Sequence, residues 1–456
     1  MSKTKIGLVS LGCPKNLVDS EEMLGALIGS GDAEMVGHSE SADVLVVNTC
    51  AFIESAKQES IDAILAAVGR KQRGEIRKVI VTGCLAQRYG AELTDEIPEV
   101  DAFLGVQSAN QINDAVFGVA SARRLSTLLP MADTPSRNQV APITEKYPLI
   151  PPTRLRATAP WTAYLKVSEG CDHACTFCSI PSFRGKHRSK PIERILDEAH
   201  RLVDGGTREI NLIAQDTTAY GMDLYQELAL SRLLEGLGRI RGLRWVRLLY
   251  CYPTMMTDRL IQTMAATPNV AHYVDIPLQH GDDSMLKLMK RGGSVASYLR
   301  LFERLRSAMP DVAIRTTFLV GFPGEDDAAF ANLKQFVTAA EFDRLGVFEY
   351  SAEDGTPGFD MTPRVPRRSA AARRRGLMEL QQPISLKKNA ALIGREFDVL
   401  VEGRRGDLLV CRSWRDAPEI DGAVLVRGAA ETAPGEWLGV RVTEAEPYDL
   451  VAEPTF

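Results

Sequence analysis

Apolar runs of five or six residues alternate with amphipathic segments along the first hundred residues of the chain. The pattern predicts strands at residues 6–11, 43–48 and 78–82, and helices at 16–28 and 55–68. Strands that are apolar on both faces and separated by helices are typical of a parallel sheet with covered faces. We therefore predict an N-terminal parallel α/β domain over residues 1–120.

A second alternating series occupies the middle of the chain. It predicts six strands, at residues 163–167, 209–214, 245–250, 272–276, 313–320 and 345–350. Six strands are too few to close an eight-stranded barrel. We expect a partial (βα)6 barrel, open on one side, within residues 160–390.

Two segments of different composition flank this central domain. Residues 121–159 are rich in proline, arginine, threonine and serine, which suits neither a helix nor a central strand, so we interpret them as a linker. Residues 391–456 contain short alternating runs broken by glycine, proline and aspartate. These runs predict a small antiparallel β-barrel and complete an α/β protein with an all-β tail.

Composition narrows the class of protein. The chain has 456 residues, of which 45% are hydrophobic, and a formal net charge of -5. We expect neither a secretory signal nor a membrane span, because only a short apolar strand follows the first lysines. Eight cysteines do not make a disulfide scaffold in a chain of this length, so we expect a reducing cytoplasm. The acidic balance argues against binding nucleic acid through bulk positive charge.

The central feature of the sequence is a CxxxCxxC array formed by Cys171, Cys175 and Cys178. Three thiolates in one short loop can hold a 4Fe-4S cube at three corners and leave the fourth iron open. A structural zinc ion is the alternative. It normally requires four protein ligands, and the candidates His173 and His187 match no common spacing.

The array, with Phe177 immediately before its last cysteine, resembles the cluster loop of radical S-adenosylmethionine (SAM) enzymes. The resemblance implies that SAM binds the open iron and that one electron from the cluster cleaves SAM to a 5'-deoxyadenosyl radical. Such a radical removes hydrogen from an unactivated carbon, and the cofactor supplies that chemistry. The resemblance also implies a (βα)6 barrel. The Gly-Gly-Glu pattern common after the second strand of these enzymes is absent at residues 214–217.

Three further cysteines occupy equivalent places in the N-terminal domain. Cys13, Cys50 and Cys84 each follow one of the three predicted strands, so a parallel sheet would bring them to one carboxyl edge. That edge is where open α/β sheets bind ligands. One interpretation is three ordinary buried cysteines, a frequent core residue. The other is a second cube held at three corners.

An α/β domain of this kind before a radical SAM domain resembles the methylthiotransferase family, whose members hold two 4Fe-4S clusters. Residues 11–20, LGCPKNLVDS, and 50–56, CAFIESA, are similar to its RimO branch, whereas the branches that act on transfer RNA usually differ there. The RimO branch modifies an aspartate of small-subunit ribosomal protein twelve. The resemblance implies that the cluster at Cys13, Cys50 and Cys84 handles the inserted sulfur. It also implies that the C-terminal barrel is a TRAM domain.

Turn residues at the ends of central strands are the candidates for SAM contacts. Gln279 could reach a ribose hydroxyl or an amino-acid head group, and a bend at Gly321 and Gly324 could let the backbone approach a nucleoside. Turn formation without a ligand explains them equally well. Arg184, Lys186 and Arg188 follow the cluster loop, and we expect them to lie in a solvated loop.

The charge of the tail bears on the substrate. Residues 391–456 contain seven arginines, no lysine and thirteen acidic residues, a net charge of -6. Because phosphate binding depends on clustered lysine and arginine, such a domain suits a basic protein better than RNA. We expect a ribosomal protein as partner, with a sulfur donor, an electron donor and only secondary contact with nucleic acid. The alternatives are a methylthiotransferase for transfer RNA adenosine and a non-catalytic iron-sulfur electron carrier.

Overall fold

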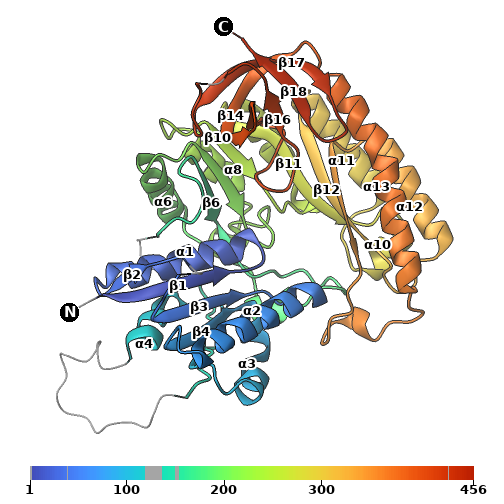
Figure 1. The fold of residues 1–456 in the computed structure, drawn as a ribbon. Coiled ribbons are helices and arrows are strands. Elements are labelled where there is room, and N and C mark those ends of the chain that lie inside the picture. Colours follow the sequence, from blue (N-terminus) through green and yellow to red (C-terminus); the bar gives the residue numbers. More distant parts are fainter. Residues whose placement is uncertain (1–2, 38–39, 119–135, 149–153, 430, 456) are drawn as a thin grey trace. The chain divides into compact units, whose positions relative to one another are not determined.

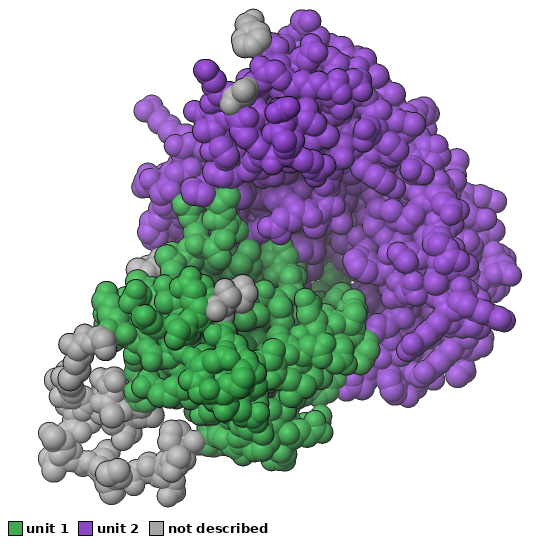
Figure 2. All heavy atoms as spheres, viewed as in Figure 1, with its two compact units in different colours: residues 1–159, 168–173, 178–190 green, residues 160–167, 174–177, 191–456 purple. Residues whose placement is uncertain are grey.

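The computed structural model describes residues 3–37, 40–118, 136–148, 154–429 and 431–455. The chain forms two compact units, coloured separately in Figure 2. The first consists of Met1–Ala159, Ser168–His173 and Cys178–Lys190, and the second of Pro160–Val167, Ala174–Phe177 and Pro191–Phe456. The cluster loop is therefore divided, because Cys171 and Cys178 belong to the first unit and Cys175 to the second.

The first unit is built on a five-stranded sheet in the order β2-β1-β3-β4-β5 (Figure 1), and every adjacent pair is parallel. Its strands are β1 (Thr4–Ser10), β2 (Ala33–Met35), β3 (Val44–Thr49), β4 (Lys78–Gly83) and β5 (Ala102–Phe103). Its helices include α1 (Pro14–Gly29), α2 (Glu54–Gln72), α3 (Cys84–Glu96), α4 (Ile112–Phe117) and α5 (Ile180–Arg184). The short antiparallel strands β7 (Ser168–Glu169) and β8 (Arg188–Ser189) also belong to it. Buried valines, isoleucines and leucines of β3 and β4 form its core with α2 and α3.

The three long strands predicted in the N-terminal domain are confirmed. The short strands β2 and β5 escaped prediction because three and two residues are too few to show a periodicity. Much of the predicted linker, 121–159, lies outside the described residues. In its described part, the Gln139 backbone N–H donates to the Phe103 carbonyl at 2.9 Å, so this stretch borders the sheet. The predicted domain boundaries stay a prediction.

The second unit contains a six-stranded parallel sheet in the order β13-β12-β11-β10-β9-β6 (Figure 1). The sheet does not close, as predicted for a partial barrel. Its strands are β6 (Thr162–Lys166), β9 (Glu209–Ile213), β10 (Trp245–Leu248), β11 (Val270–Gln279), β12 (Ala313–Val320) and β13 (Arg344–Glu349). The connecting helices are α6 (Ile192–Asp204), α7 (Met222–Tyr225), α8 (Leu230–Leu237), α9 (Asp258–Ala266), α10 (Asp283–Leu288), α11 (Val295–Ala308) and α12 (Asp327–Ala340), followed by α13 (Arg367–Ala390).

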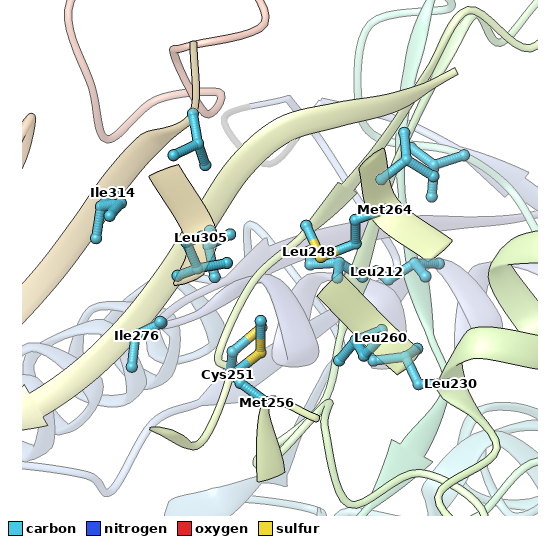
Figure 3. Packing of buried hydrophobic residues seen from close by; sticks show 14 of the residues in the cluster. Leu212, Leu230, Leu248, Cys251, Met256, Leu260, Met264, Ile276, Leu305 and Ile314 are labelled. Atoms are coloured by element: carbon cyan, nitrogen blue, oxygen red, sulfur yellow. The ribbon is translucent and has the colours of Figure 1, made fainter. Parts of the chain in front are cut away.

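One face of this sheet packs against the helices through an apolar core (Figure 3). Leu212, Leu248 and Ile276 come from three neighbouring strands and belong to one apolar cluster with Leu260 and Met264 of α9. Burying each such side chain contributes about 1.5–3 kcal/mol. The apolar residues of these strands therefore form the face that meets the helices.

The opposite face of the sheet is polar, although the apolar runs in the sequence do not indicate this. Glu209, Arg247, Asp275 and Arg315 point away from the apolar core and are all buried or nearly so. Arg247 and Glu209 form an ion pair at 3.1 Å with both side chains fully buried, and Arg315 pairs with Asp275 at 2.8 Å. Charges hidden in this way require partners, because an unpaired buried charge costs several kcal/mol.

The end of the chain forms the closed β-barrel predicted from the sequence. Its strands are β14 (Glu396–Arg405), β15 (Leu408–Arg412), β16 (Val424–Val426), β17 (Trp437–Ala445) and β18 (Leu450–Pro454). Most of its pairings are antiparallel, whereas β16 and β18 pair in parallel. The strand β18 was not predicted.

The last residue of β15 and the loop between β15 and β16 supply partners for the polar face of the six-stranded sheet. Arg412 donates to Glu209 at 2.5 Å, and Arg415 donates to Asp343 at 2.8 Å. Asp421 accepts a hydrogen bond of 2.6 Å from the Tyr273 hydroxyl. The small barrel is thus held to the sheet by buried charges. In the described part of the chain, no helix has both the length and the apolar character needed to cross a membrane.

Candidate metal centre

The first candidate site lies at the carboxyl edge of the five-stranded sheet. Cys13 directly precedes α1, Cys50 directly follows β3, and Cys84 is the first residue of α3. Because β1, β3 and β4 are consecutive in the sheet, their carboxyl ends are adjacent. The structure therefore brings together the three cysteines that the sequence placed at strand ends.

Asn16 links the three loops that present these cysteines. Its side-chain amide donates to the carbonyls of Leu11, at 3.1 Å, and Thr49, at 2.7 Å, while its oxygen lies 3.4 Å from the Cys84 sulfur. Asn16 is fully buried. Its side chain consequently fixes the spacing of the loops rather than contacting solvent.

The three thiols are close enough for their charges to interact. Burial raises the pKa of Cys50, and the neighbouring Cys13 thiolate raises it further. Burial also raises the pKa of Cys84 to about 12, with Cys13 and Cys50 acting in the same direction and Arg184 opposing them. A site that disfavours bare thiolates at Cys50 and Cys84 but provides a cation suits a positively charged metal group, because such a group neutralises the thiolates.

The cation of this site is Arg184, at the end of α5. Its guanidinium donates to the Cys84 sulfur at 3.2 Å and to the Asn16 side-chain oxygen at 2.5 Å. Asp19, at 2.9 Å, and Glu169, at 3.1 Å, form ion pairs with it. Burial alone would lower the pKa of Arg184, but Cys84 and the two carboxylates outweigh that effect and raise it well above its ordinary value.

The expectation of a solvated loop after the CxxxCxxC array is wrong for two of its three basic residues. Arg184 and Arg188 are 2% and 3% exposed, and only Lys186 is exposed. Arg188 donates to the backbone oxygens of Thr144 and Arg184. Exposure could not be inferred from charge alone, because the partners of Arg184 are Glu169, 15 residues away, and Asp19, near the start of the chain.

The donor set fits an iron-sulfur cube better than a single ion. None of the eight cysteines forms a disulfide bond. Among the residues that the structure describes, no three histidine, cysteine, aspartate or glutamate side chains converge closely enough to hold one metal ion. Structural zinc requires four ligands around one ion. The described residues do not provide four such ligands, so they do not support the zinc interpretation. In a cube each cysteine binds a different iron, and the sulfurs need not converge.

The first unit also holds two cysteines of the CxxxCxxC array. The backbone N–H of Cys171 donates to the Gly185 carbonyl at 3.0 Å, and the Asp172 side chain accepts a hydrogen bond of 2.9 Å from the His187 backbone. These bonds fold the loop back on itself. Cys171 and Cys178 are partly exposed, as ligands of an accessible group must be.

In the second unit, Cys175 is buried and lies beside Arg291. The guanidinium donates to the Cys175 sulfur at 3.5 Å and stacks on the Tyr252 ring, 4.3 Å from its centroid. Phe177 packs on a small apolar cluster that includes Met289 and Phe322. The aromatic residue before the last cysteine therefore anchors the loop, and its assignment as a cofactor contact stays a prediction.

The other residues proposed to contact SAM lie at strand ends as expected. Gln279 is the last residue of β11 and has a left-handed backbone, with φ of 74°. Gly321 follows β12 with φ of 79°, and a Cβ there would lie 2.5 Å from the Cβ of Ala370. Gly324 donates its N–H to the Pro363 carbonyl at 3.0 Å. Packing alone thus requires a glycine at position 321, and the SAM contacts stay a prediction.

Two polar residues of the candidate sites were missed from the sequence. Asn16 and Arg291 were not singled out, although each contacts a cysteine sulfur. A signal existed for Asn16, which lies three residues after Cys13 and so one helical turn away. No local signal existed for Arg291, which is 116 residues from Cys175 in the chain.

Comparison with known proteins supports the three-part organisation. Residues 5–105 match the Uncharacterized protein family UPF0004, residues 165–337 match the Radical SAM superfamily, and residues 393–454 match the TRAM domain. The three matches cover, in turn, most of the N-terminal sheet, most of the six-stranded sheet and the small barrel.

Full-length relatives decide the family. The chain is 46% identical to the ribosomal protein uS12 methylthiotransferase RimO of Symbiobacterium thermophilum, over 99% of this chain and 91% of the relative. It is also 46% identical to the RimO of Geobacter sulfurreducens, over 99% of both chains. The chain belongs to the RimO family of ribosomal protein uS12 methylthiotransferases. The resemblance inferred from the cysteine motifs is therefore confirmed.

Solved structures share the fold of this RimO family member at low sequence identity. The radical SAM methyltransferase TsrM from Kitasatospora setae, a structure with cobalamin and a [4Fe-4S] cluster bound, aligns with a TM-score of 0.54 at 12% identity. That alignment covers 95% of this chain and 84% of TsrM. The radical SAM enzyme OxsB aligns with a TM-score of 0.53 at 12% identity, over 83% of this chain and 56% of OxsB. These likenesses concern the fold alone.

Proposed function

We propose that the chain is a radical SAM methylthiotransferase that replaces a hydrogen on the β-carbon of an aspartate in ribosomal protein uS12 with a methylthio group. The observation that supports this most strongly is the 46% identity to RimO proteins over nearly the entire chain. The three cysteines at one sheet edge and the CxxxCxxC loop agree with it, since they provide two separate thiol triads.

We propose that Cys171, Cys175 and Cys178 hold one 4Fe-4S cluster and that Cys13, Cys50 and Cys84 hold a second. When bound, these groups and SAM supply the radical that removes the substrate hydrogen and the methylated sulfur that replaces it. The chain's own residues fix the ligands. Arg291 donates to the Cys175 sulfur, while Asn16 holds the loops of the other triad in place.

Protein is a better acceptor than transfer RNA for this chain. The C-terminal barrel and its flanking residues, 391–456, have a net charge of -6. Several of its arginines are already paired, as Arg427 is with Glu444 at 2.7 Å. A surface of this charge repels phosphate and attracts a basic ribosomal protein. The transfer RNA alternative therefore lacks support in the charge, and contact with nucleic acid is secondary, through the ribosome.

The reaction also needs partners. We propose a sulfur donor and an electron donor, because methylthio insertion consumes sulfur and SAM cleavage consumes an electron. A ribosomal substrate places the reaction in the cytoplasm. An electron carrier without chemistry of its own is the remaining alternative, and it differs in one product: it would not convert SAM to 5'-deoxyadenosine when reduced.

Mass spectrometry of ribosomal proteins and transfer RNA from cells with and without this chain tests the proposal. We expect uS12 to gain the mass of one methylthio group on an aspartate peptide only when the chain is present. With purified protein, Cys175→Ala should abolish both 5'-deoxyadenosine formation and modification. Cys13→Ala should abolish modification and retain 5'-deoxyadenosine formation. A mass gain found only on a nucleoside would show that the acceptor is wrong.

A further inference from the structure

Arg184 connects the two cysteine motifs within the first unit. It lies six residues after Cys178, at the C-terminal end of α5, and its side chain is only 3% exposed. Yet the sulfur that it contacts belongs to Cys84, one hundred residues earlier. A residue of the helix that follows the CxxxCxxC array therefore donates to a cysteine of the other triad.

The two terminal nitrogens of the Arg184 guanidinium have different partners. One nitrogen, Nη1, donates to both oxygens of Glu169 at 3.1 Å. The other, Nη2, faces the Cys84 sulfur at 3.2 Å, together with Asp19 and Asn16. A rigid planar fork of this kind can hold one edge in place with a carboxylate while the other edge faces a thiolate. Glu169 and Asp19 thus orient the group that meets the sulfur.

A purely structural ion pair does not explain the arrangement. Burying an arginine among two carboxylates and a thiol is costly unless every charge is matched, and an apolar cluster of equal volume would serve the fold as well. The two carboxylates already exceed the single positive charge. The contact with the Cys84 sulfur is therefore not needed to neutralise Arg184, although it supplies a donor to the thiolate.

We infer that Arg184 is a positioning residue of the N-terminal cluster, an inference that rests on the proposed function. Its hydrogen bond and positive charge stabilise the Cys84 thiolate as a ligand. Hydrogen bonds to ligand sulfurs and nearby charge also set the reduction potential of iron-sulfur clusters. Loss of Arg184 should therefore weaken binding at Cys13, Cys50 and Cys84 and lower the reduction potential of whatever cluster remains.

The test isolates the N-terminal triad. In a full-length background with Cys171, Cys175 and Cys178 all replaced by alanine, only the other triad remains to bind a cluster. Arg184→Met and Arg184→Lys are made in this background, and Lys186→Met serves as the matched control because Lys186 is an exposed base two residues away. Each variant is reconstituted anaerobically and assayed for iron, sulfide, its electron paramagnetic resonance spectrum and its reduction potential.

We expect Arg184→Met to retain at most half the iron of the background and to show an altered spectrum and a lower potential. Arg184→Lys should recover part of each, because a single cation remains near the sulfur. The Lys186→Met control should match the background. Glu169→Gln weakens the contact that orients Arg184 but leaves its positive charge in place, so it should lower the potential less than Arg184→Met does.

Thermal unfolding of the same variants separates this role from a purely structural one. An unchanged potential and spectrum in Arg184→Met beside a lowered thermal stability would overturn the inference, as would an iron content equal to that of the background. Because neither the iron content nor the potential requires the substrate, failure to methylthiolate uS12 would refute the proposed function separately.

Discussion

Replacing Glu209 with glutamine tests the charged network that joins the small barrel to the six-stranded sheet. Glu209 is fully buried and accepts two hydrogen bonds from Arg247 and two from Arg412. The Thr162 hydroxyl adds a fifth bond at 3.1 Å. Glutamine keeps the size of the side chain but removes its charge. The buried side chains of Arg247 and Arg412 would then lose the carboxylate that they share.

Two independent estimates give the magnitude. Breaking a buried ion pair by removing one partner costs about 3–5 kcal/mol. Burial would raise the pKa of Glu209, but the Arg412 and Arg247 charges outweigh it and lower that pKa from 4.5 to about 2. A difference of that size corresponds to about 3 kcal/mol of folding free energy at neutral pH. We therefore expect Glu209→Gln to lower the free energy of unfolding of the second unit by about 3 kcal/mol.

Tryptophan fluorescence during urea unfolding measures this loss selectively. All four tryptophans, Trp161, Trp245, Trp414 and Trp437, belong to the second unit. The matched control is Asp398→Asn. Asp398 also joins the small barrel to the sheet, through Arg244 at 2.6 Å, but both side chains of that pair are largely exposed, so its loss should cost less than about 1 kcal/mol.

The pH dependence of the same difference provides a check on its sign. A carboxylate whose pKa is depressed on folding contributes stability above its unfolded pKa and loses that contribution as pH falls through the folded pKa. The gap between wild type and Glu209→Gln should therefore be complete above about pH 5 and shrink to roughly half by pH 3. A loss no larger than that of Asp398→Asn, or a gap that widens toward acid, would refute the reasoning.

Two further predictions concern the cysteines and their neighbours. Gly83→Ala should halve the iron content of reconstituted protein, from about eight to about four per chain, because Gly83 has φ of 94° and a Cβ there would lie 2.2 Å from the Asn48 side-chain oxygen. Gly31→Ala, with a similar φ and nothing within 4 Å, should leave the iron content unchanged. In metal-free folded protein at neutral pH, Cys251 and Cys411 should resist alkylation, because both are buried and burial raises the pKa of each thiol. Peptide mass spectrometry showing both labelled before unfolding would contradict that expectation.

Much of the fold could be predicted from the sequence because its strands have apolar faces that must meet helices. The positions of Cys13, Cys50 and Cys84 followed from topology, since parallel strands end at one edge. The polar face of the six-stranded sheet could not be predicted in the same way. A charged residue within a strand pattern usually indicates an exposed position. Glu209 is buried instead, and one arginine that pairs with it, Arg412, lies 203 residues away in the chain.

In the candidate site too, features set by neighbouring residues could be predicted, whereas contacts between distant residues could not. The CxxxCxxC array is local, so its ligands could be proposed from spacing alone. Arg184 was expected in a solvated loop because its partners Asp19 and Glu169 come from separate parts of the chain. A single sequence contains no record of such pairings. Short strands such as β5 were missed because their pairing, and not their composition, defines them.

The buried ion pairs that attach the small barrel to the sheet limit how this barrel can be exchanged between related proteins by recombination. Arg412 ends β15, and Arg415 and Asp421 lie in the loop that follows it. Arg412 and Asp421 meet partners on strands of the sheet, and Arg415 meets Asp343 immediately before β13. A barrel transplanted from a relative would leave the sheet with unmatched charges unless that loop came with it. The loop and the polar face of the sheet should therefore be inherited as one module, and chimeras should be joined upstream of Pro160 rather than between the sheet and the barrel.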